Sequence, residues 1–326
     1  MKKTKFPLLC LPIILISKIL VYFNVIEIRN LIKCSKKTKA IVKQTEACKL
    51  YTAKFSLSDA RNGSHDLLKF ILKSKTGQEI PYCGNNSNIM GYSFPNDFPR
   101  MTTVIDEALE IFVENSNFKN VVLHEHASDY PGLFYWLSHR GVEEIELDSS
   151  TITNEELFIF LRSFKTSQKI VLSVLPRTQF QIRQDLECKT LVFSNATFIR
   201  MNVVIASQCE ELILDQCEFY EDQLKDLLRR WLSGSAMTKM RRLQFLRLHR
   251  PYNPDFLEDF EYTRLTRKQF VSKYKDAEDL DNLVGAAVIT RSDGATATVP
   301  LFPHVFLYPV ILSRLDFFAF FEYPSS

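Results

Sequence analysis

The chain has 326 residues, 46% of them hydrophobic and 24% charged, which is enough to bury a sizeable core in one or two domains. With only 9 glycines and 13 prolines, it is neither collagen-like nor dominated by a low-complexity linker. The formal net charge is +3, yet about a dozen Lys or Arg residues fall within residues 1–54, where Glu27 and Glu46 are the only acids. The N-terminal segment is therefore expected to meet an acidic partner, whether a protein, a nucleic acid or a membrane surface.

The N-terminus has features of a secretory signal, because three lysines precede an apolar run. Against this interpretation, Pro7 and Pro12 break the run, Lys18 interrupts it, and no small-x-small cleavage site follows. The run is also too short to span a membrane. An amphipathic helix that begins at Pro12 is favoured, because apolar residues recur at three- and four-residue spacing at Leu15, Ile16, Ile19, Leu20 and Phe23. The alternative, a secreted or membrane-associated leucine-rich-repeat-like binding protein, stays open.

Two more short helices are predicted, at residues 27–33 and 35–43. Three such helices in about 40 residues cannot bury their own apolar faces well. The segment is therefore expected to be completed by another protein.

Residues 6–43, FPLLCLPIILISKILVYFNVIEIRNLIKCSKKTKAIVK, resemble the F-box of a large nematode family that couples an F-box to an F-box-associated domain of the second type. One departure is Val25, where relatives often have a proline between the first two helices. The positions that carry the resemblance are Phe6, Pro7, Leu8, Leu11, Pro12, Leu15, Ile19, Leu20, Phe23, Glu27, Leu31, Ser35, Lys36, Lys37 and Lys39.

The resemblance implies that this segment binds a Skp-family adaptor, which joins it to the cullin scaffold of a ubiquitin ligase. The contact residues that it implies are Phe6, Pro7, Leu8, Leu11, Pro12, Leu15, Ile19, Leu20, Phe23 and Leu31. Leu11, Pro12, Ile19 and Leu20 are expected to be the anchors. For each of them, ordinary packing between the helices is the alternative role.

The rest of the chain is predicted to be α/β, so that short all-α F-box helices precede a leucine-rich-repeat-like curved β/α domain. A β-hairpin or small sheet is expected over residues 50–82, followed by a loop at 83–100. The predicted domains are 1–49 (F-box), 50–100 (connecting hairpin and loop), 101–300 (substrate domain) and 301–326 (an apolar tail of uncertain status).

Helices and strands are expected to alternate beyond Met101. The predicted helices are 104–115, 131–140 ended by Gly141, 154–164 with a capping box of Thr153 and Glu156, and 220–232 ended by Gly234. The predicted strands are 121–126, 142–150, 169–176, 189–195, 210–217 and 241–248. They recur every 20 to 31 residues, which resembles irregular leucine-rich repeats with a parallel sheet. A doubly wound sheet remains the alternative.

The F-box-associated domain of the same family is also similar to two stretches of this chain. One is residues 188–248, with Trp231 and Gly234 in a W-x-x-G turn, and the other is 279–299, near Asp293, Gly294 and Thr298, which resembles a closing hairpin. The resemblance ends after Val299, and the aromatic tail that follows fits an alternative splice form or a mispredicted exon.

No phosphate loop, HExxH pair, nucleophile elbow or dinucleotide fingerprint occurs, so we expect no enzyme activity and no cofactor. Seven cysteines, an odd count without a CxxC pair, predict reduced thiols in a cytoplasmic or nuclear protein, and the sequons at Asn62, Asn85 and Asn195 are interpreted as chance matches. Three weaker hypotheses each have an ordinary structural explanation: a metal at His124-Glu125-His126, a nucleophilic Cys209 or Cys217, and nucleic acid at Lys36-Lys37-x-Lys39.

The function expected from these patterns is a substrate-recognition adaptor, with no nucleic acid or membrane partner. The candidates for contact with an unidentified protein substrate are charged residues on predicted strands, Glu144, Glu146, Asp148 and Asp215. Solvated strand positions are the alternative explanation.

Overall fold

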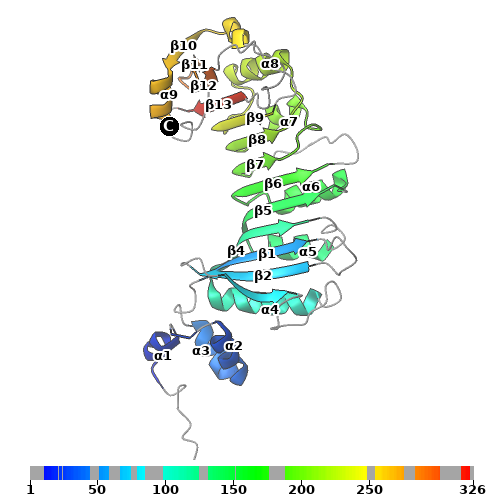
Figure 1. The fold of residues 1–326 in the computed structure, drawn as a ribbon, viewed down its shortest axis with the longest axis vertical. Coiled ribbons are helices and arrows are strands. Elements are labelled where there is room, and N and C mark those ends of the chain that lie inside the picture. The colour runs from blue at the N-terminus through cyan, green and yellow to red at the C-terminus, as the bar shows by residue number, and fades with distance from the viewer. Residues whose placement is uncertain are drawn as a thin grey trace, which may run out of the picture. The chain divides into compact units, whose positions relative to one another are not determined.

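The computed structural model describes most of the chain (Figure 1). The described residues are 11–20, 22–23, 25–44, 51–58, 67–74, 79–84, 98–124, 131–150, 152–175, 188–247, 254–274, 283–301 and 317–323. They belong to two compact units, Met1–Glu143 and Glu144–Ser326, which we describe separately.

The first unit opens with the three predicted helices, α1 (Ile13–Leu20), α2 (Val25–Cys34) and α3 (Lys36–Gln44). The carbonyl of Pro12 accepts hydrogen bonds from the first turn of α1, from Leu15 N at 2.9 Å and Ile16 N at 3.1 Å, as a proline that initiates a helix should. Ser35 Oγ accepts a hydrogen bond from Thr38 N at 3.0 Å, which caps α3. All three helix predictions are confirmed.

A small sheet follows, with the strand order β4-β1-β2-β3. Its strands are β1 (Tyr51–Ser58), β2 (Leu67–Ser74), β3 (Glu79–Gly84) and β4 (Val113–Leu123). The first three pair antiparallel, which confirms the predicted hairpin, and β4 pairs parallel to β1. Phe55, Phe118 and Trp136 meet edge-on at its centre, with ring centroids 5.6 to 5.9 Å apart.

The helix predicted at 104–115 was wrong at both ends. It is α4 (Phe98–Phe112), so it starts six residues earlier and the chain enters β4 directly at Val113. Pro99 sits in the first turn, where its missing N–H costs nothing, and its carbonyl accepts from the hydroxyls of Thr102 and Thr103 at 3.0 and 2.9 Å. At the other end, pairing of Val113 with β1 ends the helix, a contact that local periodicity does not report.

The second unit contains five parallel strands that neighbour one another in chain order. These are β5 (Val142–Ser149), β6 (Lys169–Val174), β7 (Thr190–Phe193), β8 (Glu211–Asp215) and β9 (Arg242–Leu246). A doubly wound sheet reverses its strand order at a switch point, and β5 to β9 show no such reversal. Three helices lie between strands in the sequence: α6 (Asn154–Ser163), α7 (Met201–Ala206) and α8 (Glu221–Leu232).

The predicted helix ends are confirmed where a capping residue or a glycine next to the helix determines them. Thr153 and Glu156 form the capping box of α6, with Thr153 N donating to Glu156 Oε2 at 2.8 Å and Glu156 N donating to Thr153 Oγ1 at 3.2 Å. In the first unit α5 (Pro131–Ser138) is followed by Gly141 at φ +66°, and α8 is followed by Gly234 at φ +72°. Both glycines adopt the left-handed conformation that terminates a helix.

The chain then adds antiparallel strands next to β9, in the order β10-β11-β12-β13-β9. These elements are η4 (Pro254–Asp259), β10 (Tyr262–Thr266), α9 (Arg267–Lys273), β11 (Gly285–Thr290), β12 (Thr296–Leu301) and β13 (Phe317–Glu322). The predicted closing hairpin is β11–β12, with Gly294 at φ +88° in its turn. β13 comes from the tail and pairs with β12 on one side and β9 on the other.

Arg291 fastens the turn of this hairpin to the end of α8. Its guanidinium lies 5.3 Å from the ring centroid of buried Trp231 and donates to the Trp231 carbonyl at 3.2 Å. The same guanidinium makes two hydrogen bonds to Asp293, at 2.9 and 2.6 Å, and lies over the ring of Tyr323. The stretches 188–248 and 279–299 therefore meet at this arginine.

Candidate functional site

Consecutive apolar residues at the start of α1 are exposed. Ile13, Ile14 and Leu15 are 43%, 68% and 46% exposed, and Pro12 before them is exposed too. Aliphatic side chains this open on a short helix are unusual for a surface that faces only water. Later in α1, Ile16 and Leu20 pack inward and are 2% and 1% exposed.

The predicted contact residues include both exposed and buried positions. Phe6, Pro7 and Leu8 lie outside the described residues. Pro12 and Leu15 are exposed, and four others are half-buried: Leu11, Ile19, Phe23 and Leu31. Leu20, one of the four expected anchors, lies in the core of the chain's own helices, which is the alternative role considered for it. Sequence reasoning did not select Ile13, Ile14 or Tyr22, the last 88% exposed. Ile14 lies on the side of α1 away from Ile16 and Leu20, whereas Ile13 shares their side at the end of the helix and Tyr22 follows α1.

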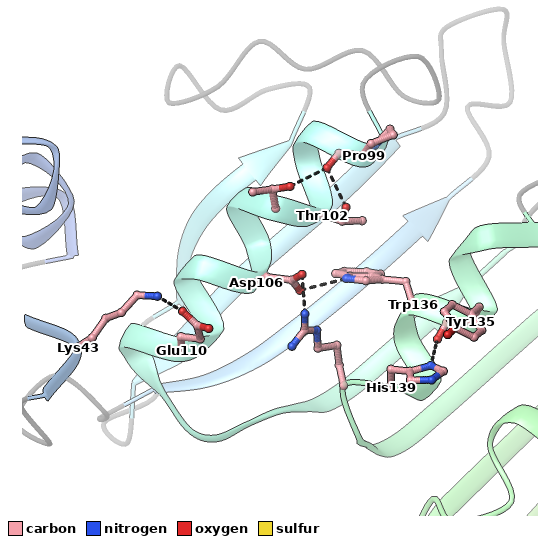
Figure 2. A network of polar contacts seen from close by, with 10 residues as sticks. Lys43, Pro99, Thr102, Asp106, Glu110, Tyr135, Trp136 and His139 are labelled. Carbon is pink, nitrogen blue, oxygen red and sulfur yellow. Dashed lines mark hydrogen bonds and ion pairs between the residues drawn. The ribbon is translucent and has the colours of Figure 1, made fainter. Parts of the chain in front are cut away.

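Two lysines of α3 form ion pairs with α4, and the other two form none with the described residues. Lys39 forms an ion pair with Glu107 of α4. Lys43 forms one with Glu110 of the same helix (Figure 2). Exposed pairs of this kind contribute about 0.2–1 kcal/mol each. Lys36 and Lys37 are exposed, and no ion pair joins them to any residue that the structure describes. These two remain available to an acidic partner.

The family comparison decides what this helical segment is. The family model of the F-box domain matches residues 8–49. Residues 8–49 are an F-box domain. F-box domains bind the Skp subunit of SCF ubiquitin ligases, so the match supports an SCF adaptor role in general. F-box proteins are generally adaptors rather than enzymes. The comparisons with curated proteins and with solved structures each found no match.

Beyond the F-box, the outward face of β5 to β9 carries the residues predicted to contact a target. Along β5, Ile145 and Leu147 are buried, whereas Glu144, Glu146 and Asp148 alternate with them and are half-buried. Strand register places Asp215 of β8 on the same face. The structure therefore brings all four predicted residues to one face of the sheet. Asp215 is bound by Arg247, whose Nε donates to Oδ1 at 2.6 Å.

The network around Asp106 in the first unit is structural. Its carboxylate accepts from Trp136 Nε1 at 3.0 Å and from the Arg140 guanidinium at 2.7 Å (Figure 2). Both oxygens are engaged and tie α4 to α5. Nearby His139 contacts the Tyr135 carbonyl through Nδ1 at 2.8 Å.

The cysteines considered as nucleophiles lie in the core. Cys209 and Cys217 are both fully buried, and the Sγ of Cys209 lies 3.4 Å from that of Cys188. The hydrogen bond between the two thiols, together with burial, raises the pKa of Cys188, whereas the same hydrogen bond lowers the pKa of Cys209. Because Cys209 is fully buried, its thiol has no access to a substrate. These contacts agree with the role of packed thiols.

The described residues contain neither a metal-binding cluster nor a membrane-spanning helix. Among the described residues, no three His, Cys, Asp or Glu side chains are grouped closely enough to hold a metal ion. Of the triplet His124-Glu125-His126, only His124 is described, and it follows the end of β4. Within the same described ranges, no helix is both long enough and apolar enough to cross a membrane.

Proposed function

We propose that this protein is the substrate-recognition adaptor of an SCF-type ubiquitin ligase. The observation that carries the proposal is an F-box whose first helix turns Pro12, Ile13, Ile14 and Leu15 toward solvent. A Skp-family subunit would bury these side chains and link the chain to the cullin. The F-box would occupy residues 1–49, residues 50–100 would connect it, and 101–300 would hold the target.

The mechanism is proximity rather than chemistry by this chain. The ligase supplies an activated ubiquitin, and the adaptor raises the effective concentration of the target's lysines near it. No residue of the adaptor needs to touch the thioester. A cytoplasmic or nuclear setting follows, because SCF ligases act there.

The target-binding part would be a leucine-rich-repeat-like F-box-associated domain of the second type, as in the nematode family. Three observations support this: the parallel strands β5 to β9 follow one another in chain order, Trp231 and Gly234 end α8, and the hairpin β11–β12 is fastened to Trp231. The predicted contact residues on the outward face would meet the target.

Co-purification with a Skp-family subunit tests the proposal. The double variant Leu11→Asp, Pro12→Asp places two charges in the proposed interface and should abolish co-purification. The matched control is Thr238→Asp, Lys239→Asp, two neighbouring exposed residues of the second unit, which should co-purify as the wild type does. Retention of the Skp subunit by the first double variant would contradict the proposal.

A further inference from the structure

The outward face of the parallel strands contains an apolar row. Register aligns Val171 of β6, Val192 of β7 and Ile213 of β8 side by side, perpendicular to the strands. All three are half-buried, while their strand neighbours on the other face, such as Leu172 and Leu191, are fully buried. Adjacent strands lie about 4.8 Å apart, so the row is about 10 Å long. It is bordered on the β5 side by Glu146, which register places next to Val171.

The charges around this row are not balanced. In the neighbouring row, Glu144 lies beside Lys169 and Glu211 beside Arg242, so acids and bases alternate and offset each other. In the apolar row the β6 neighbour of Glu146 is Val171, and no ion pair joins Glu146 to any residue that the structure describes. A carboxylate that borders an apolar strip in this way favours a cation at that end.

The distance between neighbouring strands indicates which kind of secondary structure can bind along the row. Each of the inner strands β6, β7 and β8 has a paired strand on both sides, so no strand edge is open there and an occupant must bind through side chains. On an α-helix, residues three or four apart advance about 4.5 to 6 Å along the axis, close to the 4.8 Å between strands. A helix that lies across the strands therefore sets successive residues of one face over successive strands.

We propose that this face binds an amphipathic helix of the target, in which a Lys or Arg lies one turn from two consecutive apolar positions. The apolar side chains cover Val192 and Ile213, and the cation reaches Glu146. At the far end of the row Ile213 lies beside Gln244 of β9, which carries no charge, so the cation is expected at the Glu146 end. The inference rests on the proposed function, since it specifies the target of the same adaptor.

A display library tests it. The probe is a set of 18-residue helical peptides, randomised at four positions one turn apart on one face and selected on the full chain bound to its Skp subunit. Selected peptides should carry a Lys or Arg one turn from two apolar residues. In fluorescence anisotropy, Glu146→Lys should weaken a selected peptide about tenfold. Exchanging the peptide's cation for Glu should restore binding to that variant.

The matched control is Glu155→Lys, an exposed acid in the first turn of α6, which should change affinity less than about twofold. A library that yields no enriched sequence, or one without a preference for a cation, overturns the proposal, as does unchanged affinity in Glu146→Lys. Skp binding is measured on the same samples. If the chain binds the Skp subunit but selects no peptide, only the proposed class of target is refuted. If the chain does not bind the Skp subunit, the adaptor function itself is refuted.

Discussion

Two isoleucines of α1 that are two residues apart allow docking to be tested separately from folding. Ile14 is 68% exposed and Ile16 is 2% exposed, although both are aliphatic residues of the same helix. Full burial of an isoleucine side chain stabilises by about 1.5–3 kcal/mol, so a Skp subunit that covers the exposed two-thirds of Ile14 gains about 1–2 kcal/mol. Ile14→Ala should therefore weaken Skp binding by roughly five- to thirtyfold and change the free energy of unfolding by less than about 0.5 kcal/mol.

Ile16→Ala is the matched comparison, because it removes the same atoms from the core. It should lower the free energy of unfolding by about 2–5 kcal/mol and reduce the helical signal of the F-box in circular dichroism. The assays are calorimetric titration with the purified Skp subunit and urea unfolding of each variant. If Ile14→Ala binds as tightly as the wild type while its fold is intact, the exposed turn of α1 is not the docking surface.

Two further predictions concern the second unit. Thr153→Ala removes the capping box of α6 and should cost about 1 kcal/mol in urea unfolding, and an unchanged midpoint would show that the cap contributes nothing. The hydrogen bond from Arg291 lowers the pKa of Asp293 to about 2, so the carboxylate stabilises the native state above pH 4 and loses this effect as the pH falls to 2. Asp293→Asn should therefore be less stable than the wild type at pH 7, and the difference should vanish between pH 4 and pH 2. A difference that is independent of pH would rule out this ion pair as the cause.

Local signals were sufficient for much of the helical structure. Thr153 with Glu156 and the glycine at Gly234 act within one turn, so their effect can be predicted without knowing the rest of the fold. The end of α4 could not be predicted in this way, because Val113 leaves the helix to pair with Tyr51, more than 60 residues away. A periodic pattern reports helical tendency and contains no information about that partner.

The candidate sites show the same division. Alternation alone grouped Glu144, Glu146 and Asp148, because side chains two residues apart on a strand share a face. Alternation could not identify Val171, Val192 and Ile213 as one row, since their alignment depends on the register between three strands. On α1 the resemblance selected Leu20, which is buried, and omitted Ile14, which is the most exposed residue of that turn. The exposed side of a helix is decided by what the other helices cover.

The apolar tail forms a strand whose pairing partners are distant in the sequence. Its Phe317–Glu322 segment is a short run of apolar residues that ends in Glu322, and its partners in β9 lie about 70 residues earlier, where no local pattern points. In the structure β13 lies between β12 and β9, with Ala319 and Phe321 buried and the Phe321 ring 5.2 Å from that of Trp231. Without it, β9 and β12 would each present an unpaired edge, which favours unwanted association. A splice change in this segment would thus remove an interior strand, and the aromatic character of the segment follows from the core that it helps to fill.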